Sequence, residues 1–263
     1  MKKKVLFVAA LFTASFGMAQ DLTSKKGETI LPEAGDYAIG FDANPFLSYF
    51  GNMFNSGANA PFSANFTNAN QAIYGKMFTD ANNAYRLGLR VGAGSTTTTT
   101  LVADASAGAS AGDMVEDEAK TSGFNLVLSA GKEMRRGNTR LQGFYGAEAM
   151  IALTTSKTEN TYGNDIEDLG AGASRVLDSK AGTVFGLGAR GFVGVEYFVA
   201  PKISVAAEYG WGLMISSTGE GETTTESFDG TDDSTDTAKT GKSSSFGLDT
   251  DVSGGSLRVM FHF

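Results

Sequence analysis

ISVAAEYGWGL, at residues 203–213, alternates between two kinds of side chain. Ile203, Val205, Tyr209 and Trp211 belong to an apolar set, whereas the intervening positions are small or polar and include Glu208. A period of two places successive side chains on opposite faces of a β-strand. The stretch is therefore predicted to form a strand with one apolar and one polar face.

The same alternation occurs in seven further segments, at 36–43, 71–78, 85–93, 123–132, 140–152, 183–198 and 252–263. Each is close to the roughly 9–11 residues that a tilted strand needs to cross a bilayer. Their connections alternate between short ones and long ones: 80–84, 133–139 and 200–202 are short, and 44–70, 94–122, 153–182 and 214–251 are long.

Short turns on one side and long loops on the other are typical of outer-membrane barrels, with the turns toward the periplasm. The predicted fold is therefore all-β: a transmembrane antiparallel up-and-down β-barrel of eight strands, with short periplasmic turns and long extracellular loops. A soluble β-sandwich is the alternative. It would not require connections that alternate in length.

The first residues have the pattern of a secretory signal. Lys2, Lys3 and Lys4 precede an apolar run at 5–12, which is too short to span a membrane as a helix. Small residues then allow cleavage before Gln20. We expect a signal peptide at 1–19, a periplasmic segment at 20–35 and an outer-membrane barrel at 36–263.

Composition excludes several function classes. The chain of 263 residues has 21 basic and 29 acidic residues, which disfavours nucleic acid as a partner. It has no cysteine, so disulfides, thiolate metal sites and cysteine nucleophiles are excluded. Its single histidine limits acid–base and metal chemistry. We therefore predict no enzyme activity, no catalytic residue, no cofactor and no metal site.

The last strand has the alternation in its clearest form, with apolar positions Leu257, Val259, Phe261 and Phe263. This pattern resembles the C-terminal signal that the barrel-assembly machinery reads in bacterial outer-membrane proteins. Further resemblance lies in KKGE at 25–28, ILPEAGD at 30–36, GFDANPFL at 40–47 and GFVGVEYF at 191–198.

Together these segments resemble the small eight-stranded outer-membrane barrels of the OmpX and OmpA-transmembrane-domain type, especially the β-barrel family of Bacteroidota. The resemblance implies an integral outer-membrane protein with extracellular loops. It also implies that outer-membrane lipids and the barrel-assembly machinery are partners.

Charged residues recur on the predicted inner face. An eight-stranded barrel has an interior that side chains just fill, so buried charges must be paired. Glu208 is diagonal to Arg190 across the turn at 200–202, within reach of a long side chain. Asp42, Lys76, Arg140 and His262 are also expected to face inward. The predicted ion-pair residues are Arg86, Arg90, Glu148, Arg190, Glu196, Glu208 and Arg258.

The first long loop contains an apolar and aromatic cluster, made of Phe46, Leu47, Tyr49, Phe50, Met53 and Phe54. It is the candidate partner-binding surface. Folding over the barrel mouth as a lid, or lying at the membrane interface, are the alternatives.

The other long loops, at 95–122 and 215–251, are rich in Thr, Ser, Gly and acidic residues, which favours flexible, hydrated segments. The alternative is that parts of these loops extend the strands above the membrane. Ser234 and Thr237 follow aspartates in a pattern that resembles the O-glycosylation sites of Bacteroidota. An unmodified loop is the alternative.

Three function classes follow. The first is a structural or interaction protein, including an accessory subunit of a larger outer-membrane complex together with other outer-membrane proteins. The alternative is a narrow channel or a carrier for small molecules, which the charged inner face disfavours. A barrel enzyme needs a histidine near the outer rim, but His262 is expected at the periplasmic end.

Overall fold

The computed structural model describes residues 22–24, 26–43, 73–250 and 256–263. The described part is built of β-strands, with one short 3-10 turn, η1 (Glu167–Leu169). No helix in this part of the chain has the length and apolar character needed to span a membrane. The strands are β1 (Tyr37–Asp42), β2 (Ile73–Asp80), β3 (Asn83–Ala103), β4 (Met114–Arg136), β5 (Leu141–Thr161), β6 (Ser174–Lys180), β7 (Val184–Ala200), β8 (Ile203–Thr218), β9 (Glu222–Phe228), β10 (Asp233–Lys239), β11 (Ser243–Thr250) and β12 (Ser256–His262).

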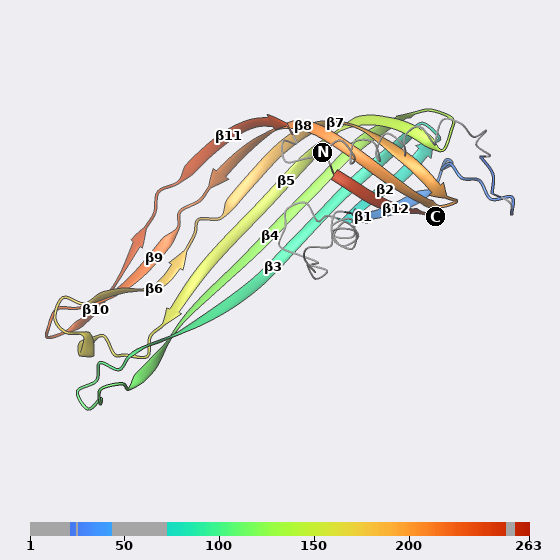
Figure 1. Ribbon diagram of the computed structural model, residues 1–263. Coiled ribbons are helices and arrows are strands. Elements are labelled where there is room, and N and C mark those ends of the chain that lie inside the picture. Colours follow the sequence, from blue (N-terminus) through green and yellow to red (C-terminus); the bar gives the residue numbers. More distant parts are fainter. Residues whose placement is uncertain (1–21, 25, 44–72, 251–255) are drawn as a thin grey trace, which may run out of the picture.

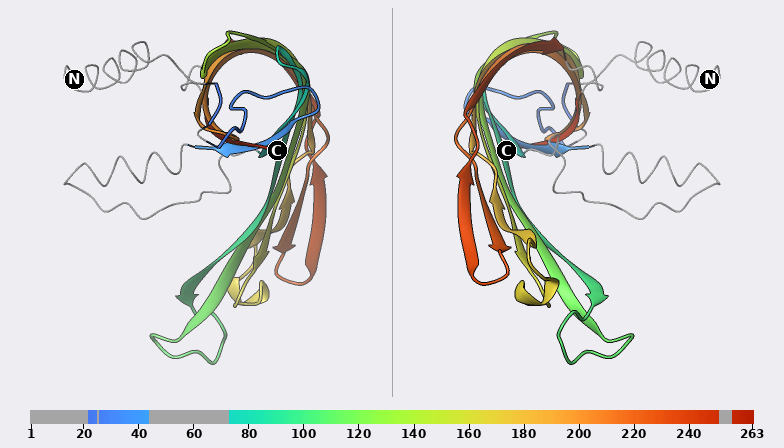
Figure 2. Two further views of the ribbon diagram at one scale, coloured as in Figure 1. Left: turned by 90° about the vertical axis from the view of Figure 1, so that its right-hand side faces the viewer. Right: turned by 90° about the vertical axis from the view of Figure 1, so that its left-hand side faces the viewer.

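Eight strands form a closed antiparallel ring, which is seen end-on in Figure 2. The order around it is β1, β2, β3, β4, β5, β7, β8 and β12. The last strand returns to the first, with Ala38 opposite His262 and Asp42 opposite Arg258. The predictions of an all-β chain and of eight antiparallel strands that close on themselves are confirmed.

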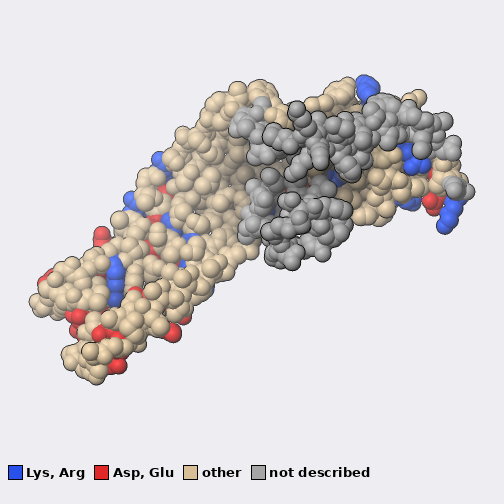
Figure 3. Space-filling model, viewed as in Figure 1, with Lys and Arg blue, Asp and Glu red and all other residues tan. Residues whose placement is uncertain are grey.

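Side chains in the ring alternate as the period of two predicts, but with polar groups inside. In β3, Arg86 and Arg90 are buried, whereas Leu87 and Val91 on the opposite face are 64% and 57% exposed. The outward face of the ring is therefore largely apolar. In Figure 3 the coloured charged atoms gather toward the two ends of the molecule.

Beyond the ring the sheet continues into a second region, which we call the extended sheet: residues 94–123, 154–180 and 219–242. Strands β3, β4 and β5 run into it without a break. Its strand order is β10, β9, β6, β5, β4 and β3. It projects to one side of the ring as a single curved layer (Figures 1 and 2). Thr96 to Leu101 are exposed on both faces of this layer.

The extended sheet corrects the prediction of flexible, hydrated loops at 95–122 and 215–251, and it also contains much of the long connection predicted at 153–182. Most of these residues are in strands that pair along their whole length. Their hydrophilic composition hid the strands, because a strand that is exposed on both faces has no apolar period of two.

The boundary between the two regions is marked by short interruptions in three neighbouring strands. Single backbone hydrogen bonds bridge them, from Ala181 N to Ser156 O at 3.0 Å and from Gly219 N to Thr183 O at 2.9 Å. A Cβ atom on Gly182 would lie 2.0 Å from the Gly219 carbonyl oxygen. Glycine is therefore required at this crossing. β6 and β7, and likewise β8 and β9, act as continuous strands.

The N-terminal segment lies across the other end of the ring (Figure 2). It is tied to β2 by hydrogen bonds from Gly35 N to Phe78 O and from Phe78 N to Asp36 O. Ile30 is only 2% exposed. With Pro32, Lys202, His262 and Phe263 it lines a cavity of about 170 Å³ at this end.

Candidate functional site

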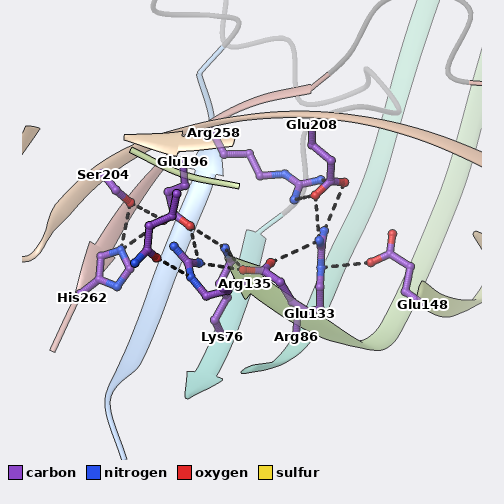
Figure 4. Close-up of polar contacts among 11 residues, drawn as sticks. Lys76, Arg86, Glu133, Arg135, Glu148, Glu196, Ser204, Glu208, Arg258 and His262 are labelled. Atoms are coloured by element: carbon purple, nitrogen blue, oxygen red, sulfur yellow. Dashed lines mark hydrogen bonds and ion pairs between the residues drawn. The ribbon is translucent and has the colours of Figure 1, made fainter. Parts of the chain in front are cut away.

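The interior of the ring contains a network of buried charged side chains. Every one projects from an inward position of a ring strand, so the period of two that forms the strands also brings the charges together. Figure 4 shows them converging from several strands. The network consists of Lys76, Arg86, Glu133, Arg135, Glu148, Arg190, Glu196, Glu208 and Arg258.

One half of the network is centred on Glu208 of β8. Arg86 Nη1 and Arg190 Nη1 each lie 2.7 Å from its carboxylate oxygens, and Arg258 Nη2 lies 2.9 Å away. Glu148 accepts a hydrogen bond from Arg190 at 3.1 Å and forms an ion pair with Arg86 at 3.3 Å. Glu208 is 3% exposed. One carboxylate thus holds three strands to β8 by its charge.

The other half is centred on two carboxylates, Glu133 and Glu196, both of which are fully buried. Lys76 Nζ lies 2.9 and 3.0 Å from them, and Arg135 Nη1 lies 2.7 and 2.6 Å from them. Arg135 also donates through Nε to Gln142 at 2.8 Å. Two cations are therefore shared between two anions, which is the arrangement that buried charges require.

Aromatic rings separate and cover the charged groups. The Arg86 guanidinium lies 3.9 Å from the centre of the Phe192 ring, and that of Arg258 lies 3.7 Å from the Tyr74 ring. These distances are typical of cation–π contacts. Arg86 also lies 3.5 Å from Glu133, which joins the two halves. The ion pairs and the aromatic side chains together occupy the middle of the strand ring.

A serine and the single histidine meet Glu196 at the end covered by the N-terminal segment. Ser204 Oγ donates to Glu196 and lies 2.9 Å from His262 Nε2, which is itself 3.4 Å from Glu196 Oε1. A catalytic triad needs the acid on the other ring nitrogen. Here Nδ1 has no hydrogen-bond partner among the described residues, and Ser204 is fully buried. The group ties β7, β8 and β12 together.

The structure places six of the seven predicted ion-pair residues within this network. The seventh, Arg90, is 5% exposed and donates through Nε to Asn125 at 3.0 Å. The predicted diagonal contact between Arg190 and Glu208 is the 2.7 Å pair described above. Arg140, which was expected to face inward from a strand, is half-buried in the turn directly before β5.

Two residues at the centre of the network, Glu133 and Arg135, were missed because 133–139 was predicted as a turn. β4 continues to Arg136, so both remain on its inward face. The signal was present, since Gly131, Glu133 and Arg135 continue the alternation of the predicted strand at 123–132.

The other predicted site residues lie away from this network. Phe46, Leu47, Tyr49, Phe50, Met53 and Phe54 lie outside the described residues. The assembly-signal positions alternate with the buried positions of the last strand, and Phe261 and Phe263 are 41% and 62% exposed. Leu257 and Val259 are half-exposed beside them.

The two candidate glycosylation residues lie on β10, which is exposed throughout. Ser234 Oγ lies 3.0 Å from Ser227 Oγ, and Thr237 Oγ1 lies 3.1 Å from Thr224 Oγ1. Both hydroxyls are therefore at the surface, on a strand rather than in the predicted flexible loop.

Within the described ranges no group of three or more His, Asp or Glu side chains is placed to hold a metal ion. Neither the protein-family models nor the curated proteins include a match to this chain.

Proposed function

We propose that the ring is an up-and-down β-barrel that spans a bacterial outer membrane, and that the protein acts as a structural or interaction protein through the extended sheet. One observation carries the proposal: the outward face of single strands changes character along its length. In β4, Leu128, Leu126 and Phe124 are followed on the same face by Lys120 and Glu118. A strand with this change fits two different solvents, lipid and then water.

Aromatic side chains border the apolar face at both ends, as they do where membrane proteins meet the two interfaces. Each is exposed on the outside of the sheet. Toward the extended sheet these are Phe124, Phe185 and Phe246, and toward the covered end they are Tyr37, Tyr85 and Tyr145.

The filled interior supports an interaction role over conduction. Glu133, Arg135 and Glu196 are fully buried, and every charge of the network has a partner within 3.5 Å. An ion would have to break these pairs to pass, and each broken buried pair costs roughly 3–5 kcal/mol. The partners in this proposal are outer-membrane lipids, the barrel-assembly machinery and other outer-membrane proteins.

Cell fractionation and gel mobility test the membrane assignment. We expect recovery in the outer-membrane fraction, and an unboiled sample that migrates faster than a boiled one because the folded barrel stays compact in detergent. Recovery in the soluble periplasm would refute the proposal. Planar bilayers test the role: steady conductance by the wild-type protein would favour the narrow channel instead.

A further inference from the structure

The extended sheet has one strand edge without a partner in the described part of the chain. β3 pairs with β4 over all 21 of its residues. Its other edge pairs with β2 only over Asn83–Leu89. Among the described residues, no strand therefore pairs with the backbone from Val91 to Ala103 on this edge. An unpaired strand edge is a template for another strand.

This edge lacks the features by which proteins usually prevent strand addition. Residues 91–103 include no charged residue and no proline, and Thr96–Thr100 are all β-branched and exposed. The opposite edge of the extended sheet, β10, has Asp233, Asp236 and Lys239. One edge is thus protected by charge and the other is not.

We propose that this free edge of β3 pairs antiparallel with the same edge of a second copy, and so tethers two membranes. The inference rests on the proposed function, which puts the extended sheet outside the membrane. Pairing centred on Thr98 sets Thr96 opposite Thr100 and Ser95 opposite Leu101. Every facing pair is uncharged, and cross-strand threonine pairs are favourable.

The direction of pairing follows from where β2 ends. A parallel partner strand would continue along the line that β2 occupies beside Asn83–Leu89, so the two rings would collide. An antiparallel partner centred on Thr98 uses residues 93–103 and ends before that line. The contact is the same on both copies, as a two-fold interface requires.

An antiparallel pair joins the two extended sheets into one, with the rings at opposite ends. The extended sheet projects from one side of the ring only (Figures 1 and 2), so two rings joined in this way cannot share a membrane. The partner is therefore a second copy in an opposed membrane.

Vesicle clustering tests the proposal with a charge swap at the centre of the pair. Two vesicle populations with different dyes receive wild-type protein, T98K or T98E. Wild-type vesicles should cluster. The two-fold axis places residue 98 of one copy opposite residue 98 of the other, so T98K alone or T98E alone sets two like charges against each other. Each should reduce clustering by roughly tenfold or more. Mixing T98K vesicles with T98E vesicles should restore it.

The matched control is T235K, which adds the same charge to the exposed strand at the protected edge. It should cluster like the wild type. Each variant must keep its heat-dependent gel mobility. The proposal is overturned if wild-type vesicles stay separate, if T98K vesicles still cluster, or if the mixture is not restored.

Failure of the membrane assignment is distinguishable from failure of the pairing. If the chain does not insert into vesicles, sedimentation of the same proteins in detergent measures the pairing directly. The edge contact is supported if the wild type forms dimers, if the mixture of T98K and T98E forms dimers, and if each variant alone is a monomer. A wild-type monomer overturns it.

Discussion

The ring and the extended sheet are built from the same strands but are held together differently. Along β3, the ring half alternates between buried Arg86 and exposed Leu87, whereas Thr96–Thr100 in the extended sheet are exposed on both faces. The ring therefore gains from side-chain burial and from charge pairing. The stability of the extended sheet depends instead on the backbone hydrogen bonds between its strands and on the number of strands that pair side by side.

Polar contacts differ between the two regions in the same way. In the extended sheet the Lys157 ammonium donates to Asp178 and Glu159, which raises the pKa of Lys157. The Lys157 side chain is 39% exposed, however, and such surface pairs contribute little to stability. In the ring, Glu208 has three guanidinium partners and is almost fully buried.

The largest expected effect comes from breaking one interior carboxylate. Glu208→Ala leaves Arg86, Arg190 and Arg258 with an uncompensated buried charge, so we expect the free energy of unfolding to fall by about 3–5 kcal/mol. Glu159→Ala in the extended sheet should cost less than about 1 kcal/mol. Urea titration in lipid vesicles, followed by the fluorescence of Trp211, measures both. Equal losses in the two variants would contradict the difference drawn between the regions.

A second test adds one methyl group at each of two glycines, one beside the interior network of the ring and one at an open position away from it. A Cβ atom on Gly210 would lie 2.3 Å from Arg190 Nε, so Gly210→Ala must displace a guanidinium that is held by Glu148 and Glu208. We expect a loss of about 1–3 kcal/mol in the same titration. Gly247→Ala in β11 is the control, because a Cβ there meets no atom within 4 Å. Its expected change is within about 0.5 kcal/mol.

The sequence was sufficient to predict the ring because an apolar outer face makes the period of two visible. The stretch at 203–213 became part of β8. The predicted ion pair of Arg190 with Glu208 is present, although Glu208 lies opposite Gly194 and the long Arg190 side chain spans the offset. Thr96–Thr100 have no such face, and their partners in β4 are set by a register that composition does not encode.

Turn position was the other limit of the sequence-based prediction. Residues with a charged, turn-like composition at 133–139 concealed the continuation of β4, and with it Glu133 and Arg135. Their burial depends on carboxylates and cations from β2 and β7, which lie far away in the sequence. Whether such residues lie in a strand and are buried depends on charge pairing across the ring and not on local composition.

The third test removes hydroxyl pairs from the extended sheet. Thr121 Oγ1 lies 3.2 Å from Thr158 Oγ1 on the neighbouring strand. Replacing both with valine keeps the shape and leaves no polar group unpaired, so we expect a change within about 0.5 kcal/mol. A loss as large as that of Glu208→Ala would mean that side-chain hydrogen bonds hold this region, contrary to the comparison.

The smallest effect is a local response to pH at the turn between β9 and β10. Asp229 Oδ1 accepts the backbone N–H groups of Asp232 and Thr231 at 2.9 and 2.8 Å, and these hydrogen bonds lower the pKa of Asp229 below its usual 3.8. A lowered carboxyl pKa stabilises the folded turn above the usual value, and this contribution is lost as the pH falls through the folded value. We expect the NMR titration midpoint of the Asp229 carboxyl to lie below 3.8. The amide shifts of Thr231 and Asp232 should move with it.

Asp229→Asn keeps an acceptor oxygen and removes the titration, so these amide shifts should then lose that transition. A midpoint at or above 3.8, or an unchanged transition in Asp229→Asn, would show that these hydrogen bonds do not hold the turn.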